Sequence, residues 1–232
     1  MKVIYMKAVV LSSGGLDSTT CLGIAVDKLG RENVSAVSIH YGQRNASELA
    51  CAKSVASYYG VNRYEFDVAA ILRNSSSALL NTSTAELEHS TYGEQVADGE
   101  RIETYVPFRN GLMISVAASF ADSLYDDKTV ELYIGIHQDD VAINAYPDCR
   151  ADFIQAIGTA VNIGTYGKIQ LIAPLLGKTK ADVVKIGLAL KVPYELTRSC
   201  YERGDKPCGI CATCLDRAAA FAANGVTDPA LD

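Results

Sequence analysis

From residue 7 onward, short runs rich in Val, Ile and Tyr alternate with longer segments of helical periodicity. Such alternation is typical of β-α-β units, which place their strands in a parallel sheet. It therefore predicts an α/β fold with one doubly wound, five-stranded parallel sheet and helices on both faces. The predicted strands are residues 7–11, 34–40, 63–67, 130–136 and 169–173, and the predicted helices are residues 19–28, 47–59, 110–123, 151–162 and 178–190.

Two segments depart from this alternation. Residues 85–104 hold six acidic side chains and one basic one, so we expect an exposed acidic insertion there. After residue 190 the chain carries a cysteine cluster and an Ala-rich helix, which are too small for a core of their own. We therefore expect an α/β domain over residues 1–190 and a C-terminal segment, residues 191–232, packed on it.

The charge and the apolar pattern of the sequence restrict the expected partners and location of the protein. The 232 residues carry 21 Lys and Arg against 27 Asp and Glu, a net charge of −6, with no basic run to follow a phosphate backbone. Nucleic acid is therefore not expected as the main partner. No apolar run approaches the roughly 20 residues of a membrane span, and the N-terminus has no pattern of a secretory signal. We expect a cytoplasmic protein that does not enter a membrane.

The first predicted strand runs into a loop of serines and glycines, and then into a helix that carries hydroxyls and a carboxylate. Gly14 and Gly15 allow positive φ angles and close backbone approach, while the helix amides and dipole favour an anion. A plain strand-to-helix turn, with Ser or Asp as the cap, is the structural alternative. The string predicts a loop that binds phosphate or pyrophosphate, formed by Ser12, Ser13, Gly14, Gly15, Leu16, Asp17, Ser18, Thr19 and Thr20.

Four of the seven cysteines cluster near the C-terminus with the spacing Cys-x7-Cys-x2-Cys-x2-Cys. Four thiolates at such spacing suit a tetrahedral zinc ion with no open position, which is the arrangement of a structural site. An iron-sulfur cluster is the alternative, and a redox dithiol needs fewer ligands than are present. The predicted zinc ligands are Cys200, Cys208, Cys211 and Cys214.

Three further polar motifs stand at predicted helix starts. Arg109, in the string YVPFRN, could clamp a phosphate or carboxylate, or be a solvated charge at a helix end. Asp148, in YPDCR, could contact a ligand or cap its own helix. Lys178 and Lys180 flank Thr179 and could neutralise phosphate, or belong to a solvated helix start with Thr179 as its cap.

Together these motifs resemble a known family. The string SGGLDS matches the SGGxDS signature of the PP-loop ATP pyrophosphatases, which cleave ATP between its α and β phosphates. That loop, YGQR at 41–44, YVPFRN, YPDCR, KTKAD at 178–182 and the four cysteines occur in one order. In that order they resemble the 7-cyano-7-deazaguanine synthases of queuosine precursor synthesis. The resemblance implies a Rossmann-like fold of the adenine nucleotide alpha hydrolase type.

The resemblance also implies chemistry. A homodimer would convert 7-carboxy-7-deazaguanine and ammonia to 7-cyano-7-deazaguanine through an adenylated acid and an adenylated amide. The implied cofactors are ATP, Mg²⁺, with Asp17 as a ligand, and one structural Zn²⁺ per chain. By the same resemblance, the predicted catalytic residues are Asp17, Arg109, Lys178 and Lys180. The residues predicted to contact the substrate are Arg109, Asp140, Tyr146, Asp148 and Arg150.

The chain departs from the family pattern at Phe108, where Gly is usual, and in a longer stretch between Asp140 and Tyr146. Both departures lie near the expected substrate pocket. They therefore concern which molecule accepts the adenylyl group, and not how ATP is cleaved. One alternative is therefore a related PP-loop enzyme that adenylates a different carboxylate or a macromolecular acceptor. The other is a non-catalytic module that binds an adenine nucleotide without turnover.

Overall fold

The computed structural model describes residues 6–45, 47–85, 102–138, 146–202, 204 and 206–230. Its centre is a parallel sheet of five strands in the order β3-β2-β1-β4-β5. The strands are β1 (Met6–Leu11), β2 (Val34–His40), β3 (Asn62–Asp67), β4 (Thr129–Tyr133) and β5 (Ile169–Ile172). The longer helices are α1 (Leu16–Leu29), α2 (Ser47–Tyr59), α5 (Arg109–Leu124), α7 (Ala151–Gly164), α8 (Lys180–Ala189) and α9 (Ala212–Ala223), and α3 (Ala69–Leu72) is a single turn. The predicted fold class is confirmed.

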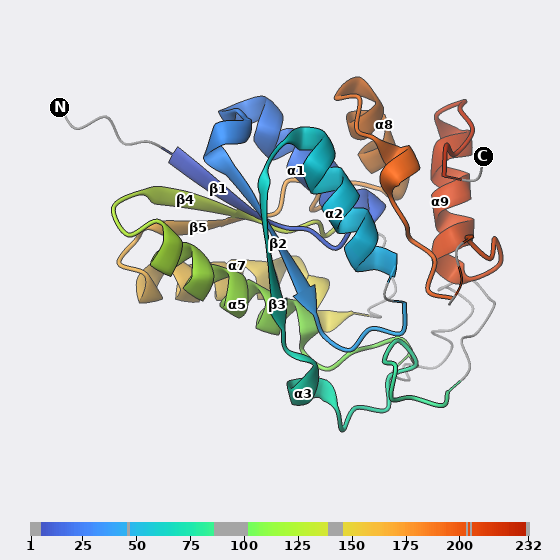
Figure 1. Ribbon diagram of the computed structural model, residues 1–232, viewed down its shortest axis with the longest axis horizontal. Coiled ribbons are helices and arrows are strands. Elements are labelled where there is room, and N and C mark those ends of the chain that lie inside the picture. The colour runs from blue at the N-terminus through green and yellow to red at the C-terminus, as the bar shows by residue number, and fades with distance from the viewer. Residues whose placement is uncertain are drawn as a thin grey trace.

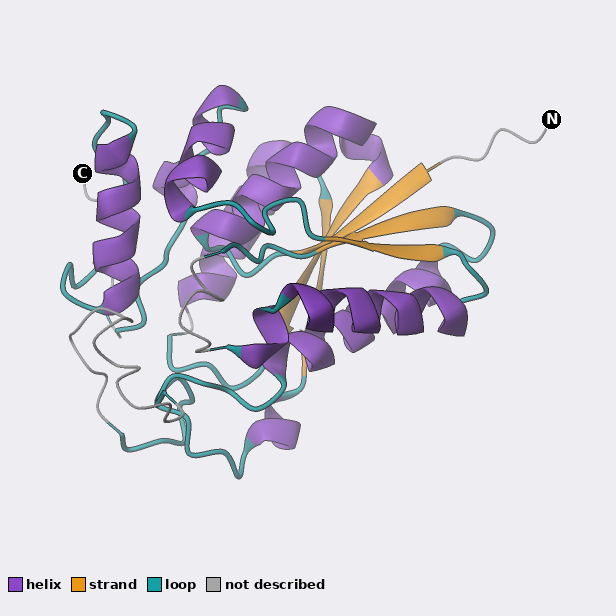
Figure 2. Ribbon diagram, turned by 180° about the vertical axis from the view of Figure 1, so that it is seen from behind, coloured by secondary structure: helices purple, strands orange, loops and turns teal. Residues whose placement is uncertain are grey.

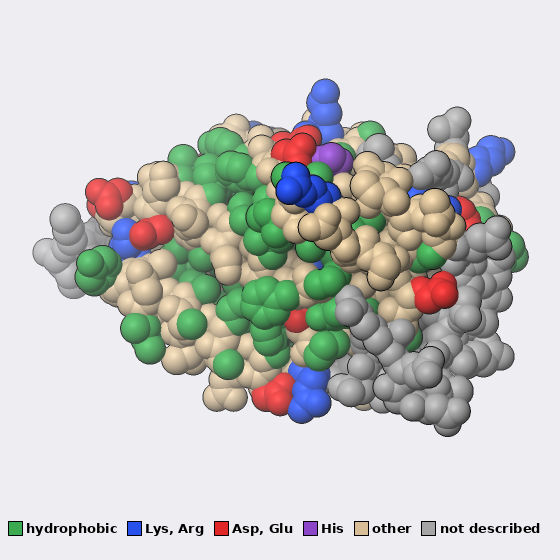
Figure 3. Space-filling model, turned by 90° about the horizontal axis from the view of Figure 1, so that it is seen from below, with side chains coloured by type: hydrophobic (Ala, Val, Ile, Leu, Met, Phe, Trp, Pro, Cys, Tyr) green, Lys and Arg blue, Asp and Glu red, His purple; other side chains and the backbone are tan. Residues whose placement is uncertain are grey.

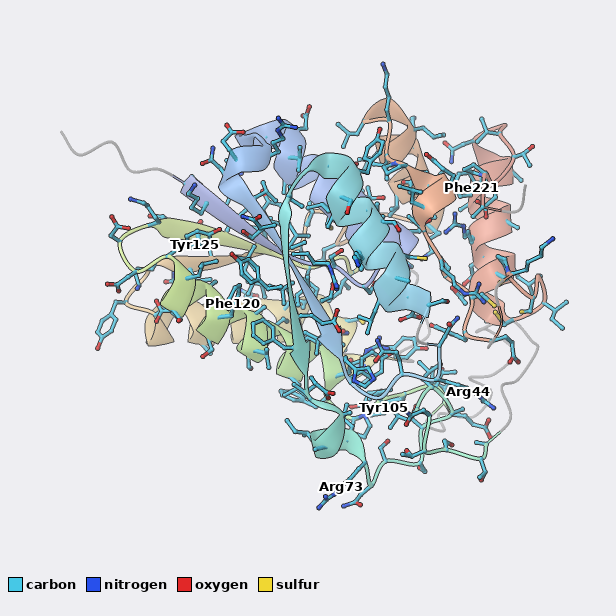
Figure 4. The ribbon with its side chains drawn as sticks, in the orientation of Figure 1. Arg44, Arg73, Tyr105, Phe120, Tyr125 and Phe221 are labelled. Atoms are coloured by element: carbon cyan, nitrogen blue, oxygen red, sulfur yellow. The ribbon has the colours of Figure 1, made fainter. Side chains whose placement is uncertain are left out.

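Helices cover both faces of the sheet (Figures 1 and 2). On one face α1 and α2 pack on residues such as Ala8 and Val10, and on the other α5 and α7 pack on Val9 and Leu132. Successive β1 side chains point to opposite faces, so a strand buried on both sides must be apolar throughout. Phe120 of α5 extends the second core to the sheet edge, where its ring lies against the rings of β3 (Figure 4).

The predicted strand at residues 130–136 is too long, since β4 ends at Tyr133. Ile134 and Ile136 stay buried after the strand, so the apolar run continues although the sheet does not. Gly135 lies between them against the backbone of Asp17 and Ser18, where a Cβ would come within 3.0 Å. The chain after β4 is thus fitted to the start of α1.

The predicted helix starts also shift. The helix predicted from residue 19 begins at Leu16, directly after the glycine pair. The helix predicted from residue 178 begins at Lys180, because Thr179 caps it: the Thr179 hydroxyl accepts from the Asp182 amide, and Asp182 accepts from the Thr179 amide.

The C-terminal segment is anchored by a buried ion pair. Arg217 of α9 donates to Asp228 at 2.6 and 2.8 Å and also to the Thr197 hydroxyl, and both charged side chains are buried. α9 packs against α8 beside it (Figure 1). The division of the chain at residue 190 stays a prediction.

Two other expectations meet the structure only in part. Most of the expected acidic insertion, residues 86–101, lies outside the described residues, and Ile102 and Thr104 are buried, so the expected exposure is wrong for these two. Across the described ranges, no helix has both the length and the apolar character needed to cross a membrane.

Candidate functional site

A cavity of about 210 Å³ opens at the carboxyl ends of β1, β2 and β4. In a parallel sheet this edge gathers the loops that follow the strands, and helix N-termini point into it. The cavity wall joins the loops that follow β1, β2 and β4, the starts of α2, α5 and α8, and the chain from Arg198 into α9. Its polar lining includes Ser12, Ser13, Asp17, Ser18, Tyr41, Gln43, Glu48, Arg109, Asn110, His137, Lys180, Arg198, Tyr201 and Asp216.

The loop after β1 is held in a tight turn. Gly14 has φ +83°, and a Cβ there would collide with the backbone of Glu48 and Ala52 in α2, so glycine is required on both grounds. The Arg198 amide donates to the Gly14 carbonyl at 3.0 Å. The Ser13 amide donates to the Ser18 hydroxyl at 3.2 Å, which links the start of the loop to α1. These contacts fix the loop from three sides.

Several polar atoms of the loop have no partner. The hydroxyls of Ser12 and Thr19 and the Oδ1 atom of Asp17 are buried and make no hydrogen bond within the described part of the chain. Burying such groups without a partner costs about 1–3 kcal/mol each. A ligand that supplies oxygens or a cation at this point would satisfy them. Thr20, the last residue of the predicted loop, instead bonds Tyr194 in the core.

Asp17, Lys180 and His137 form a cluster beside the loop. The Lys180 ammonium lies 2.8 Å from Asp17 Oδ2 and 2.8 Å from His137 Nε2. Burial raises the pKa of Asp17, but the charges of Lys180 and His137 outweigh it, so the pKa lies below its usual value. Asp17 is therefore ionised, with Oδ1 left for another cation. Lys178, predicted with Lys180, is exposed and does not line the cavity.

Arg109 lines the opposite wall at the start of α5. Its guanidinium carbon lies 5.6 Å from the centre of the Tyr41 ring, a cation–π contact. Phe108, the residue before it, has φ +51° and is the N-cap of α5, which explains why glycine suits this position. The exposed Phe108 ring covers Gly111 and meets Phe153 edge-to-face at 5.7 Å.

The structure does not place the other predicted substrate contacts on the cavity wall. Asp148 is buried and accepts from the Asn110 amide at 2.8 Å, so it caps α5 rather than its own helix. Tyr146 bonds the Thr104 hydroxyl, and Arg150 forms an exposed pair with Asp152. Their predicted substrate roles stay predictions, and Asp140 lies outside the described residues.

Glu48, His137 and Arg198 were not among the predicted site residues. Glu48 lies in the first turn of α2, and burial raises its pKa to about 7, although Arg109 and Arg198 lower it. No contiguous motif marks these three residues, because the turns of the chain bring them together from distant segments. For Glu48, its place shortly after YGQR was the one available signal.

The four clustered cysteines converge on one point. The sulfurs of Cys200, Cys208, Cys211 and Cys214 all lie within 4.8 Å of one another. The amides of Cys208 and Cys211 donate to the sulfurs of Cys200 and Cys208 at 3.3 Å, as amides do to thiolates. Hydrogen bonds from Cys211 and Cys214 lower the pKa of Cys200. The donor set is therefore that of a metal site, and its soft sulfurs suit zinc or an iron-sulfur cluster.

Comparison with known proteins decides the family. The family described as "Queuosine biosynthesis protein QueC" matches residues 7–225. The chain belongs to the QueC family. It is 41% identical over 227 residues to the 7-cyano-7-deazaguanine synthase of Archaeoglobus fulgidus, covering 97% of this chain and 90% of that one. The enzyme of the same description from Oceanobacillus iheyensis is 39% identical, with 96% of each chain covered. The predicted resemblance is thus confirmed, and the chain is an enzyme of queuosine biosynthesis.

Solved structures support the fold alone. A glutamine-dependent NAD⁺ synthetase from Acinetobacter baumannii, in complex with ADP, superposes with a TM-score of 0.51 at 18% identity, covering 85% of this chain and 33% of that one. The U34-tRNA thiolase NcsA from Methanococcus maripaludis, with its [4Fe-4S] cluster, gives 0.50 at 15% identity, covering 86% and 62%. Both likenesses concern the fold.

Proposed function

We propose that this QueC-family protein converts 7-carboxy-7-deazaguanine and ammonia to 7-cyano-7-deazaguanine at the expense of ATP. A carboxylate is a poor acceptor because its leaving group would be oxide. The acid oxygen therefore attacks the α-phosphorus of ATP, pyrophosphate leaves, and ammonia then displaces AMP to give the amide. A second adenylation, on the amide oxygen, makes AMP the leaving group again, and its loss with a proton gives the nitrile.

One observation carries this proposal: beside Lys180 on the cavity wall, the buried Ser12 hydroxyl and Asp17 Oδ1 have no hydrogen-bond partner among the residues that the structure describes, and neither has the buried Thr19 hydroxyl of α1. During adenylation, negative charge grows on the α-phosphate and on the leaving pyrophosphate. The loop hydroxyls and the free amides at the start of α1 are oriented to donate to that charge before the reaction begins. Lys180 adds a positive charge whose position is fixed by Asp17 and His137.

Asp17 suits a further role as a magnesium ligand. Its buried Oδ1 atom makes no hydrogen bond to any described residue, and hard carboxylate oxygens are the ligands that Mg²⁺ prefers. Bound there with ATP, the ion would neutralise phosphate charge. Arg109, which also lines the cavity and contacts the Tyr41 ring, would hold the substrate carboxylate or the α-phosphate as a cation.

For the four-cysteine group we propose one zinc ion per chain with a structural role. Four thiol ligands close a tetrahedral shell and leave no position for substrate. The site also ties distant segments together, since Asn45 donates to the carbonyls of Cys200 and Glu202 at 3.0 Å. A bound ion would therefore stabilise the segment that carries Arg198 to the cavity wall.

We also propose a cytoplasmic homodimer. Ile163 and Tyr166, at the end of α7, are 73% and 95% exposed, which is unusual for large apolar side chains. Hydrophobic side chains gather over the face formed by α5 and α7 (Figure 3). A second copy of the chain that covers this face would bury them, and light scattering after gel filtration tests the mass.

The mechanism is tested with substrate acid labelled with ¹⁸O in both carboxylate oxygens. Adenylation transfers one acid oxygen to AMP in each round, so each nitrile formed should be accompanied by two AMP molecules, both labelled. Mass spectrometry of the nucleotides reads the label directly. Unlabelled AMP, or ADP in its place, would contradict the proposal and favour a different acceptor or a different activation.

A further inference from the structure

Glu48 is an acidic residue on the cavity wall with no role in the mechanism so far. It lies in the first turn of α2, which rests directly on the loop, because a Cβ on Gly14 would collide with the Glu48 backbone. The Arg198 amide bonds the same glycine from the other side. Glu48 is thus fixed to the loop that holds the phosphates, at the edge of the space where the acyl adenylate forms.

The Glu48 carboxylate differs in its partners from Asp17, the acid of the loop after β1. Asp17 is held by Lys180 at 2.8 Å, whereas Glu48 makes neither a hydrogen bond nor an ion pair with any residue that the structure describes. Burial raises the pKa of Glu48 to about 7, the charges of Arg109 and Arg198 act to lower it, and the Cys200 thiol acts to raise it. A general base works best with a pKa near the working pH.

The amide-forming step needs such a group. Ammonium, the dominant form near neutral pH, has no lone pair and must lose a proton before nitrogen can attack. Arg109, Arg198 and Lys180 are cations and cannot take that proton. His137 lies 2.8 Å from the Lys180 ammonium, and Asp216, the other acid of the wall, already has an interaction of its own. Asp17 is bound by Lys180. The carboxylate of Glu48 can both attract ammonium and accept its proton.

We propose that Glu48 binds ammonium in the cavity and serves as the base that releases ammonia for attack on the acyl adenylate, an inference that rests on the proposed function. One N–H proton passes to the carboxylate, and the freed electron pair forms the C–N bond. The bond between the acyl carbon and the oxygen that links it to phosphorus breaks, AMP leaves with the electron pair of that bond, and the second proton leaves the nitrogen for water. Glu48 then returns its proton to solvent.

The test uses Glu48→Gln, which removes the base and keeps the shape, with the exposed Glu195→Gln as the matched control. Two reactions that need no ammonia should stay within about threefold of wild type: acid-dependent exchange of pyrophosphate into ATP, and conversion of 7-amido-7-deazaguanine to the nitrile. Amide formation from acid and ammonium should fall about 100-fold or more, the usual contribution of a general base. The control should be unchanged in all three.

A second nucleophile separates proton transfer from positioning. Hydroxylamine is largely uncharged at neutral pH, so Glu48→Gln should form the hydroxamate at a rate within about threefold of wild type. Equal loss with ammonium and hydroxylamine would overturn the proposal, as would loss of pyrophosphate exchange, which would place Glu48 on the deazaguanine instead.

If the Gln variant does not fold, Glu48→Asp must keep amide formation above one tenth of wild type. If the wild-type protein itself does not form the amide from the acid and ammonium, that result would refute the proposed function rather than this inference.

Discussion

Replacing Gly135 by alanine is expected to displace the start of α1 and with it the phosphate loop. The new Cβ would lie 2.9 Å from the Asp17 carbonyl carbon and from the Ser18 amide, and 3.0 Å from the Asp17 oxygen. Ordinary contacts begin near 3.4 Å, so the two backbones must separate by about 0.5 Å (3.4 less 2.9). Both partners are backbone of buried elements, which cannot rotate away as a side chain can.

We expect two consequences of this shift. Overpacking of this kind lowers the free energy of unfolding by about 1–3 kcal/mol. A misplacement of about 1 Å costs on the order of 100-fold in rate, so half that shift should cost roughly tenfold in pyrophosphate exchange. Urea unfolding and exchange assays measure the two effects. Gly164→Ala, where a Cβ meets nothing within 4 Å, is the matched control. Wild-type exchange and stability in the Gly135→Ala variant would refute the reasoning.

Three further predictions concern metal, anchoring and pH. Cys211→Ser should lose bound zinc, measured by plasma mass spectrometry, together with a fall in melting temperature; lost turnover at an unchanged melting temperature would contradict a structural role. Asp228→Asn leaves the buried Arg217 charge without its carboxylate and should cost about 3–5 kcal/mol in urea unfolding. Because burial raises the pKa of Glu48 to about 7, the folded state binds its proton more tightly than the unfolded state. The free energy of unfolding of the wild type should therefore fall as the pH rises from about 4.5 to 7, and Glu48→Gln should reduce that fall. An identical dependence of this free energy on pH in both proteins would contradict the raised pKa of Glu48.

The sheet could be predicted from sequence because β1, β2, β4 and β5 are short runs rich in apolar residues, and β3 alternates polar residues with aromatic ones. Where a run continues past its strand, as at Ile134 and Ile136, the sequence does not mark the end, since both residues are buried by other contacts. The end of β4 depends on the close approach of Gly135 to α1, which is a tertiary contact. Similarly, the start of α8 at Lys180 depends on which hydroxyl caps it.

The site divides in the same way. The loop after β1 and the cysteine group are each short stretches of sequence, so residue types and spacing were enough to single them out; the convergence of the four sulfurs is confirmed, and phosphate binding by the loop stays a prediction. Glu48, His137 and Arg198 reach the cavity only because the topology brings the start of α2, the loop after β4 and the chain before α9 to one edge of the sheet. Conversely, Arg150 ends the motif YPDCR and pairs with Asp152 at the surface, and its predicted contact with substrate stays a prediction. The sequence around a charged residue does not reveal whether its side chain points into the cavity or pairs with a neighbouring charge at the surface.

The most direct test of the account is to incubate the purified protein with ATP, magnesium, ammonium and 7-carboxy-7-deazaguanine, and to resolve the nucleotide and base products by liquid chromatography and mass spectrometry. The account predicts AMP and pyrophosphate that form only when the acid is present, with 7-cyano-7-deazaguanine as the base product. AMP released without any change in the deazaguanine would contradict it and would assign the loop chemistry to another acceptor.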